Sequence, residues 1–456
     1  MQSATKAQFD TIAAVATAPG RGGIGVIRIS GSIVKLIGKS ILQRSLPPRQ
    51  AILGNFLDDS GETIDQGIGL FFPSPASYTG EDVLELQAHG SPVVLDLLLK
   101  RVISLGARLA CPGEFTERAF HNGKLDLTQA EAVADLIASN NQMQAKLARR
   151  TLQGAFASSV SDLQALLTRQ RVLIEAGLDF SDEDLEPTDI EAVDKGIVSI
   201  IQRIDQLSHV ASQGERVRDG MTVVIVGPPN SGKSSLLNQI SGQQSAIVTP
   251  IAGTTRDLVR ADIQLDGMPL HVIDTAGIRN SCDFIEQEGI RRALEETQIA
   301  DLVLWVYDGM LGRPEAVDLQ RILATTAITL VRNKIDLLAE QPNVQEVRHS
   351  GALMHELSIS AKTGLGLGQL KEHIKKCSGY EMMVEGAFMA RRRHLVCLEQ
   401  TRNYLVAAKK SLSVGEPAEI LAEDLREAQM ALSRITGDVS SDDLLGEIFS
   451  SFCIGK

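Results

Sequence analysis

The chain has 456 residues, of which 43% are hydrophobic, and a formal net charge of -12. At roughly 150 residues per domain this length predicts about three domains, and no run approaches the ~18 apolar residues of a membrane span. The acidic balance argues against binding nucleic acid through a broad basic surface. Because the five cysteines are scattered and the start MQSATKAQFD lacks a signal pattern, we expect a cytoplasmic protein with reduced thiols.

Residues 1–122 are rich in glycine and in short strand-like runs, and they predict an α+β binding domain. The glycine-rich PGRGGIG near the start lacks a GxGxxG placed between a strand and a helix. We therefore reject a dinucleotide fold here and interpret the stretch as a tight turn.

Helices are predicted on both sides of the middle of the chain. Residues 123–218 carry apolar residues at three-and-four spacing, and residues 379–456 repeat that pattern in PAEILAEDLREAQMALSRIT and SSDDLLGEIFSSF. The acidic run 181–189 is expected to be a solvated loop with a helix start. Because each helical set has a face to bury, we expect the two sets to pack on each other, with residues 219–378 inserted between them.

The inserted region begins with a phosphate-loop motif. The β-branched run TVVIV predicts a buried parallel strand, and it leads directly into GPPNSGKS, the G-x-x-x-x-G-K-[ST] pattern. Backbone N–H groups of such a loop face phosphate oxygens, while Lys233 is expected to reach the β and γ phosphates and Ser234 to bind Mg²⁺. The expected nucleotide contacts here are Asn230, Ser231, Gly232, Lys233, Ser234 and Ser235.

Further nucleotide motifs follow in order along the chain. GTTRD offers Thr254 and Thr255 on a loop, and HVIDTAG predicts a strand that ends at Asp274. NKID and SAK predict guanine recognition. The carboxylate of Asp336 can accept hydrogen bonds from the N1–H and from the exocyclic amine of guanine, and adenine has neither the N1–H nor an amine at that position. Together they predict a doubly wound guanine-nucleotide domain. The expected contacts are Thr249, Thr254, Thr255, Asp274, Thr275, Ala276, Gly277, Asn333, Lys334, Asp336, Ser360, Ala361 and Lys362.

The residue that orients the attacking water is not given by the motifs. Many signalling GTPases place Gln directly after the DxxG glycine, but here Ile278 follows. Asp283, Glu286 and Glu288 lie downstream as acidic substitutes. No arginine finger can be assigned either, so we hypothesise that Asn230 and the carbonyls of residues 249–254 hold a monovalent cation that replaces its charge. Asn230 could instead only cap the loop.

These stretches resemble the MnmE (TrmE) family of tRNA-modification GTPases over essentially the whole chain. The generic GTPase motifs are shared by many families. The specific blocks are TAPGRGGIGVIRISG, SYTGEDVLELQAHG and PGEFTERAFHNGKLDLTQAEAV at the front and FCIGK at the end.

The resemblance implies a homodimer whose N-terminal domain binds 5-formyltetrahydrofolate or a related tetrahydrofolate. It also implies an MnmG-like partner that carries FAD, in a heterotetramer or larger complex, and the addition of an aminomethyl or carboxymethylaminomethyl group to C5 of the wobble uridine of certain tRNAs. GTP hydrolysis with Mg²⁺ and K⁺ would drive conformational change through dimerisation of the GTPase domains.

The resemblance also implies roles for individual residues. Glu286 is the catalytic carboxylate, with Glu288 as a rival, and Cys453 lies near the transferred carbon as nucleophile or as pocket lining. The implied folate contacts are Arg28, Glu85, Lys124 and Lys456; the implied Mg²⁺ ligands are Ser234 and Thr255; the implied K⁺ ligands are Asn230, Thr249, Ile251 and Thr254.

A ribosome-assembly or signalling GTPase with accessory binding domains would share every nucleotide motif but would not need the front blocks or FCIGK. A scaffold with a decayed site is disfavoured by the intact Lys233, Ser234 and Asp336. We therefore predict domains at 1–122 (folate binding and dimerisation), 123–218 (helical, first part), 219–378 (GTPase) and 379–456 (helical, second part, ending in the CIGK tail).

Overall fold

The computed structural model describes residues 10–179, 187–242, 259–265, 268–274, 300–313, 326–349, 352–378, 386–439 and 442–455. The chain divides into two compact units. The first comprises Met1–Ala138, Ala148–Ile204 and Cys397–Lys456, and the second comprises Ser139–Leu147 and Asp205–Val396.

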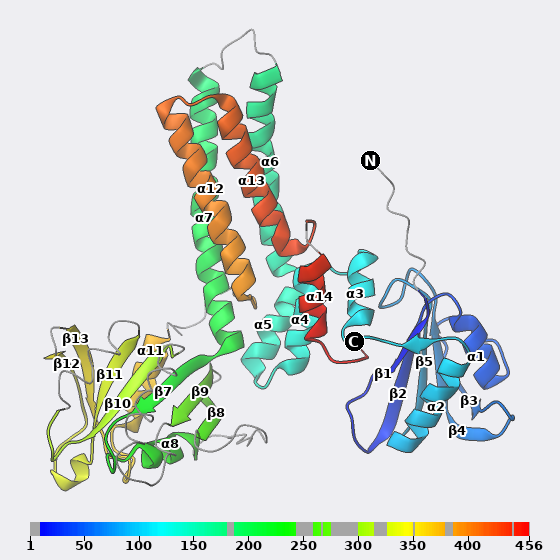
Figure 1. The fold of residues 1–456 in the computed structure, drawn as a ribbon, viewed down its shortest axis with the longest axis horizontal. Coiled ribbons are helices and arrows are strands. Elements are labelled where there is room, and N and C mark those ends of the chain that lie inside the picture. The colour runs from blue at the N-terminus through cyan, green and yellow to red at the C-terminus, as the bar shows by residue number, and fades with distance from the viewer. Residues whose placement is uncertain are drawn as a thin grey trace, which may run out of the picture. The chain divides into compact units, whose positions relative to one another are not determined.

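The first unit contains a six-stranded sheet, with two helices on one of its faces (Figure 1). Alternate residues such as Ile27 and Ile29 turn to that face and form a core with the helices, while Arg28 between them turns to the other face. The strand order is β3-β4-β5-β2-β1-β6. The elements are β1 Ile12–Val15, β2 Gly22–Ser30, α1 Val34–Leu42, β3 Ile52–Leu57, β4 Thr63–Phe72, β5 Val83–Gly90, α2 Pro92–Ser104 and β6 Arg108–Leu109.

The prediction of a tight turn at PGRGGIG was wrong for most of the stretch. Residues 22–25 lie inside β2, and the pairing of β2 with β5 shifts register between Gly22 and Gly25. A Cβ at Gly25 would lie 2.5 Å from Leu95 on α2. The glycine therefore serves the close packing of helix on sheet, which the sequence pattern did not reveal.

Helices make up the rest of the first unit, and the predicted packing between the early and the late set is confirmed. Arg171 on α6 donates to Gln429 on α13 at 2.6 Å, and Gln164 on α6 lies 3.3 Å from Ser433. The helices are α3 Glu114–His121, α4 Leu127–Ala138, α5 Gln142–Leu152, α6 Ala155–Asp179, α7 Pro187–Asp219, α12 Arg392–Val414, α13 Ala418–Thr436 and α14 Asp442–Ser450, of which α5, α7 and α12 continue into the second unit.

The second unit contains a seven-stranded sheet of order β12-β13-β11-β10-β7-β9-β8. The five inner strands are parallel, and β12 and β8 pair antiparallel at the edges, as expected for the predicted nucleotide domain; α8 and α11 share one core with the sheet. The elements are β7 Met221–Val226, α8 Lys233–Ser241, β8 Val259–Leu265, β9 Met268–Asp274, β10 Leu302–Asp308, β11 Ala327–Asn333, β12 Asn343–His349, β13 Ala352–Ser358 and α11 Leu367–Cys377.

All of β7 to α11 lies in sequence between the helices α7 and α12. The fold class is therefore the predicted one, an N-terminal α+β domain and a helical domain with an inserted phosphate-loop domain. The four domain boundaries stay a prediction. Among the helices that the structure describes, none is long and apolar enough to cross a membrane.

Candidate functional site

The phosphate loop joins β7 to α8 in the second unit. Gly232 caps the helix with φ +97, a left-handed conformation that favours glycine, and Lys233 is the first helical residue. The ammonium of Lys233 donates to the carbonyls of Gly227 and Pro228, both at 2.8 Å. Ser234 and Ser235 follow in the first turn, at the end of the helix where the helix dipole favours a phosphate. The loop thus has the geometry of an anion site.

Asn333, at the end of β11, connects the phosphate loop to the SAK loop. Its side-chain amide donates to the carbonyl of Ser231 at 2.8 Å, and its amide oxygen accepts from the N–H of Ala361 at 2.9 Å. The side chain is only 2% exposed. Buried groups of this kind must be paired, so the three loops are fixed to one another.

The neighbouring NKID residues are held by charged and hydrogen-bonded partners. Lys334 donates to Asp308 at 2.7 Å, and this hydrogen bond lowers the pKa of the Asp308 carboxyl. The hydroxyl of Ser360 donates to Asp336 at 2.6 Å and accepts from the N–H of Thr363 at 3.2 Å. The Asp336 carboxylate is therefore oriented before any ligand arrives.

A cavity of about 650 Å³ brings these loops together. Its volume lies within the roughly 300–1,000 Å³ typical of small-molecule sites. Seven of its lining residues were expected from the motifs: Gly232, Ser235, Asn333, Lys334, Asp336, Ala361 and Lys362.

The cavity also has lining residues that the sequence analysis missed, namely Asn238, Gln239, Gly242 and Leu337. Asn238 and Gln239 stand three and four positions after Ser235 on α8, so helical spacing from the phosphate loop could have identified them.

Several predicted residues lie outside the described part of the chain. They are Thr249, Ile251, Thr254, Thr255, Thr275, Ala276, Gly277, Asp283, Glu286, Glu288 and Lys456. Asp274 ends β9 beside β7, as expected for a residue next to the phosphate loop.

A second cluster of predicted residues lies in the first unit, on the sheet face away from α1 and α2. Arg28 on β2 and Glu85 on β5 stand opposite each other and form an ion pair at 2.9 Å. The guanidinium also lies 5.3 Å from the ring centre of Tyr78 and 5.9 Å from that of Phe115. The two aromatic residues were missed by the sequence analysis, although Tyr78 and Phe115 belong to the SYTGED and PGEFTE blocks.

The predicted Lys124 also belongs to the first unit. Its ammonium donates to the carbonyl of Pro75 at 3.1 Å. A Cβ at Gly80 would lie 3.4 Å from the Lys124 side chain, so that side chain lies beside the SYTGED block.

The C-terminal tail reaches the same N-terminal domain. Phe449 and Phe452 are buried in a cluster with α4, and this burial anchors the tail. The carbonyl of Cys453 accepts from the N–H of Gly113 at 3.4 Å, and the Cys453 residue is exposed. A Cβ at Gly455, whose φ is +96, would lie 2.4 Å from the carbonyl of Val15 on β1.

Comparison with known proteins decides the family. The family model described as the MnmE helical domain matches residues 127–453, and that of the GTP-binding protein TrmE N-terminus matches residues 11–124. The tRNA modification GTPase MnmE of Shewanella pealeana is 50% identical over 98% of this chain and 99% of its own length. The chain belongs to the MnmE family.

A second MnmE relative, from Sodalis glossinidius, is 49% identical over 98% of this chain and its own full length. Among solved structures, the G domain of the FeoB iron transporter of T. maritima is 27% identical over 35% of this chain and 98% of its own, at a TM-score of 0.27. The MnmE relatives align with nearly the whole of this chain, and the chain is a GTPase.

Proposed function

We propose that this chain hydrolyses GTP in the modification of the wobble uridine of certain tRNAs. The observation that supports it is the 650 Å³ cavity that joins the phosphate loop to NKID and SAK, in a chain similar over 98% of its length to a tRNA modification GTPase. Guanine is selected by the carboxylate of Asp336, which Ser360 orients.

A change of preferred nucleotide from GTP to xanthosine triphosphate tests the assignment of guanine recognition to Asp336. In Asp336→Asn an N–H donor replaces one acceptor oxygen, so the pocket loses its pairing with the guanine amine and gains a donor for the 2-carbonyl of xanthine. We expect the variant to lose GTP binding and to bind xanthosine triphosphate, measured by competition with a fluorescent nucleotide. Asn238→Ala, which changes the same cavity at α8, should keep the preference for GTP. Unchanged preference in Asp336→Asn would contradict the assignment.

Hydrolysis is assigned to Glu286, which orients the attacking water, with Mg²⁺ on Ser234 and Thr255. K⁺ is assigned to Asn230, Thr249, Ile251 and Thr254. Of these ligands, Asn230 and Ser234 lie in the described part, on the phosphate loop and the first turn of α8, and offer the oxygen atoms that hard cations prefer. When bound, the cations would offset the negative charge that develops on the phosphates.

Two measurements test the hydrolytic assignment. Glu286→Gln should lower kcat while leaving the affinity for GTP unchanged, whereas Glu288→Gln should behave as the wild type; the reverse pattern would assign the role to Glu288. Replacing K⁺ by Na⁺ at constant ionic strength should depress turnover sharply, and unchanged turnover would refute the cation site.

The one-carbon donor is assigned to the cluster around Arg28. The guanidinium of Arg28, the carboxylate of Glu85 and the ring of Tyr78 fit a flat ligand that both donates and accepts hydrogen bonds, as the pteridine of a tetrahydrofolate does. The ammonium groups of Lys124 and Lys456 suit its carboxylates. A 5-formyltetrahydrofolate or a related compound would supply the carbon that is transferred.

Cys453 is assigned to the transfer site, beside β1 and the N-terminus of α3. Cys453→Ser should abolish tRNA modification and leave GTP hydrolysis intact. Cys111→Ser, at another exposed cysteine of the same unit, should affect neither activity. Loss of both activities in Cys453→Ser would indicate a folding defect and contradict the assignment.

The working assembly is assigned as a homodimer with an FAD-containing, MnmG-like partner, in which K⁺-stimulated dimerisation of the GTPase domains drives the conformational change. Nucleoside analysis of tRNA from a deletion strain tests the whole proposal. The modified wobble uridine should disappear and return with the intact gene. An unchanged wobble uridine would leave the assembly or signalling GTPase as the better function.

A further inference from the structure

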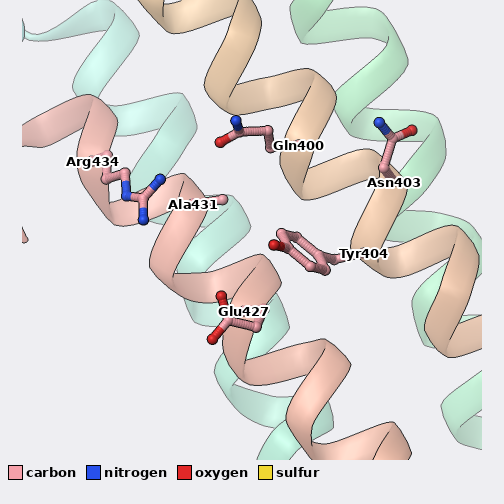
Figure 2. A pocket seen from close by; sticks show the side chains of 6 residues that line it. All are labelled: Gln400, Asn403, Tyr404, Glu427, Ala431 and Arg434. Atoms are coloured by element: carbon pink, nitrogen blue, oxygen red, sulfur yellow. The ribbon is translucent and has the colours of Figure 1, made fainter.

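A small hollow of about 260 Å³ lies on the surface between α12 and α13 (Figure 2). Gln400, Asn403, Tyr404 and Arg434, which line it, are exposed, so water can satisfy their polar groups and these groups favour no particular ligand. The nucleotide cavity of the second unit is different, because a charged side chain in its wall is held in one position from outside the cavity.

That side chain is Lys334, and the group that holds it is the carboxylate of Asp308. β10 and β11 are paired in register up to Asp308 and Asn333, so the carboxylate lies beside the first residue after β11. This residue is Lys334, whose ammonium donates to the carboxylate at 2.7 Å. Among the residues that the structure describes, Lys334 lines the cavity and Asp308 does not. Asp308 therefore acts on a bound nucleotide through Lys334.

Both partners of this ion pair are fixed. The other oxygen of the Asp308 carboxylate accepts from the backbone N–H of Met310 at 3.0 Å. The side chains of Asp308 and Lys334 are 14% and 31% exposed, so water and salt screen the pair only in part. The φ of Lys334 is +70, a left-handed conformation that residues with a side chain rarely adopt. Such a backbone persists where its surroundings hold it, and the ion pair is one of these contacts.

A different position of the Lys334 ammonium would damage guanine recognition. Asp336 stands two positions after Lys334 and lines the same cavity. One oxygen of its carboxylate accepts from the hydroxyl of Ser360 at 2.6 Å, and the carboxylate has further capacity to accept. The lysine side chain is a flexible four-carbon stem with a positive charge at its end. Without Asp308, the ammonium could pair with Asp336 and occupy the acceptor that guanine needs.

We infer that Asp308 is a positioning residue for the guanine nucleotide. It holds the ammonium of Lys334 away from Asp336, and it fixes the alkyl chain of Lys334 along the cavity wall, where the flat face of the base packs on it. Asp308 itself touches neither the base nor the phosphates. Its effect is on nucleotide binding and not on the hydrolytic step.

The inference rests on the proposed function, because the guanine must lie beside Asp336. It goes beyond that function because it gives a role to a residue of β10, which belongs to none of the nucleotide motifs. The base is the same in GTP and in GDP, so the loss of Asp308 should weaken the binding of both by the same factor.

Nucleotide binding and steady-state hydrolysis by the full-length protein test the role. Asp308→Asn removes the charge and keeps an oxygen that can accept from the N–H of Met310. Lys334 would then be ordered only when the nucleotide binds, so the KM for GTP and the Kd for GDP should each rise about 2- to 12-fold, with kcat unchanged. The matched control is Glu340→Gln, which breaks the 2.7 Å ion pair with Arg332 on β11 and should leave all three values unchanged.

The variant Lys334→Met separates positioning from a merely structural role, because methionine has a flexible apolar chain without the charge. Adding Asp308→Asn to Lys334→Met should raise neither the KM for GTP nor the Kd for GDP any further. If Asp308→Asn raised them by the same factor in that background, Asp308 would act without Lys334 and the inference would be wrong.

The inference and the proposed function fail in different ways. If Asp308→Asn binds GTP as tightly as the wild type while Asp336→Asn changes its preferred nucleotide, the inference is wrong and the guanine assignment stands. If the wild type binds ATP as tightly as GTP, the guanine assignment fails and the inference with it. A lower kcat at unchanged KM in Asp308→Asn would assign the residue to hydrolysis and would also overturn the inference.

Discussion

Replacement of Asn333 by alanine tests whether one buried amide holds the nucleotide loops together. The substitution removes the hydrogen bonds to the carbonyl of Ser231 at 2.8 Å and from the N–H of Ala361 at 2.9 Å. Ser231 is 1% exposed and Ala361 is 2% exposed, so water cannot readily replace the lost partner. Both backbone groups would be left buried and unpaired.

The magnitude follows from these two bonds. A buried group left without its partner costs about 1–3 kcal/mol, so the loss of two partners in Asn333→Ala should lower the free energy of unfolding of the second unit by about 2–6 kcal/mol. For a unit of this size each kcal/mol corresponds to roughly 2–4 °C in Tm. The affinity for GTP should fall as well, because the phosphate loop and the SAK loop lose their common support.

A second substitution makes the test specific. A Cβ at Gly232 would lie 2.1 Å from the side-chain nitrogen of Asn333, and the φ of Gly232 is +97. Gly232→Ala alone therefore introduces both a clash and backbone strain, whereas in the double variant the clash is gone. We expect the double variant to be about 1–3 kcal/mol more stable than the sum of the single effects.

The assay is denaturant unfolding followed by tryptophan fluorescence. The chain has a single tryptophan, Trp305 on β10, so the signal reports on the second unit alone. Asn238→Ala, which lines the same cavity, serves as the control for loss of an asparagine amide. The reasoning would be refuted if the effects of Asn333→Ala and Gly232→Ala simply added, or if Asn333→Ala cost no more than the control.

Three further predictions concern the tail and two buried groups. In Gly455→Ala the new Cβ should displace the tail from Val15, which should lower tRNA modification at least tenfold and leave GTP hydrolysis unchanged. Modification at the wild-type level would show that the contact with Val15 is not needed. Burial raises the pKa of Glu356, but the hydrogen bonds to its carboxylate have the larger effect and lower the pKa to about 2. About 3 kcal/mol of stability that is present above pH 4.5 should therefore be lost as the pH falls toward 2. When unfolding is measured as a function of pH, Glu356→Gln should not show this loss. Burial lowers the pKa of His373 to about 4, so as the pH falls the unfolded chain binds the proton at a higher pH than the folded chain does. Stability should therefore fall by about 3 kcal/mol between pH 6.5 and 4. A fall of the same size in His373→Gln would exclude His373 as its source.

The nucleotide site was largely predictable from the sequence because its chemistry is local. Each motif follows a buried strand, and the carboxyl ends of parallel strands meet at one edge of a sheet. Lys233, Asn333 and Asp336 could therefore be assigned before the fold was known. The hydrogen bonds by which Asn333 connects the loops could not be predicted, because one of them goes to the carbonyl of Ser231, which lies 102 positions away in the sequence.

Contacts between distant segments were not predictable from local patterns. The glycines of β2 were interpreted as a turn because their sequence does not show that α2 packs on them. The contacts of Tyr78 and Phe115 with Arg28 likewise join segments far apart in the sequence.

The sequence by itself determined the family, the GTPase motifs and the amphipathic helices, since these depend on residues close together in the chain. The tertiary structure decided where the tail lies. Phe449 and Phe452 are two of many apolar residues in the sequence, and only the folded chain buries them against α4 and sets Gly455 on β1. The physical reason is that burial and close backbone approach depend on what the distant segments of the chain bring into contact.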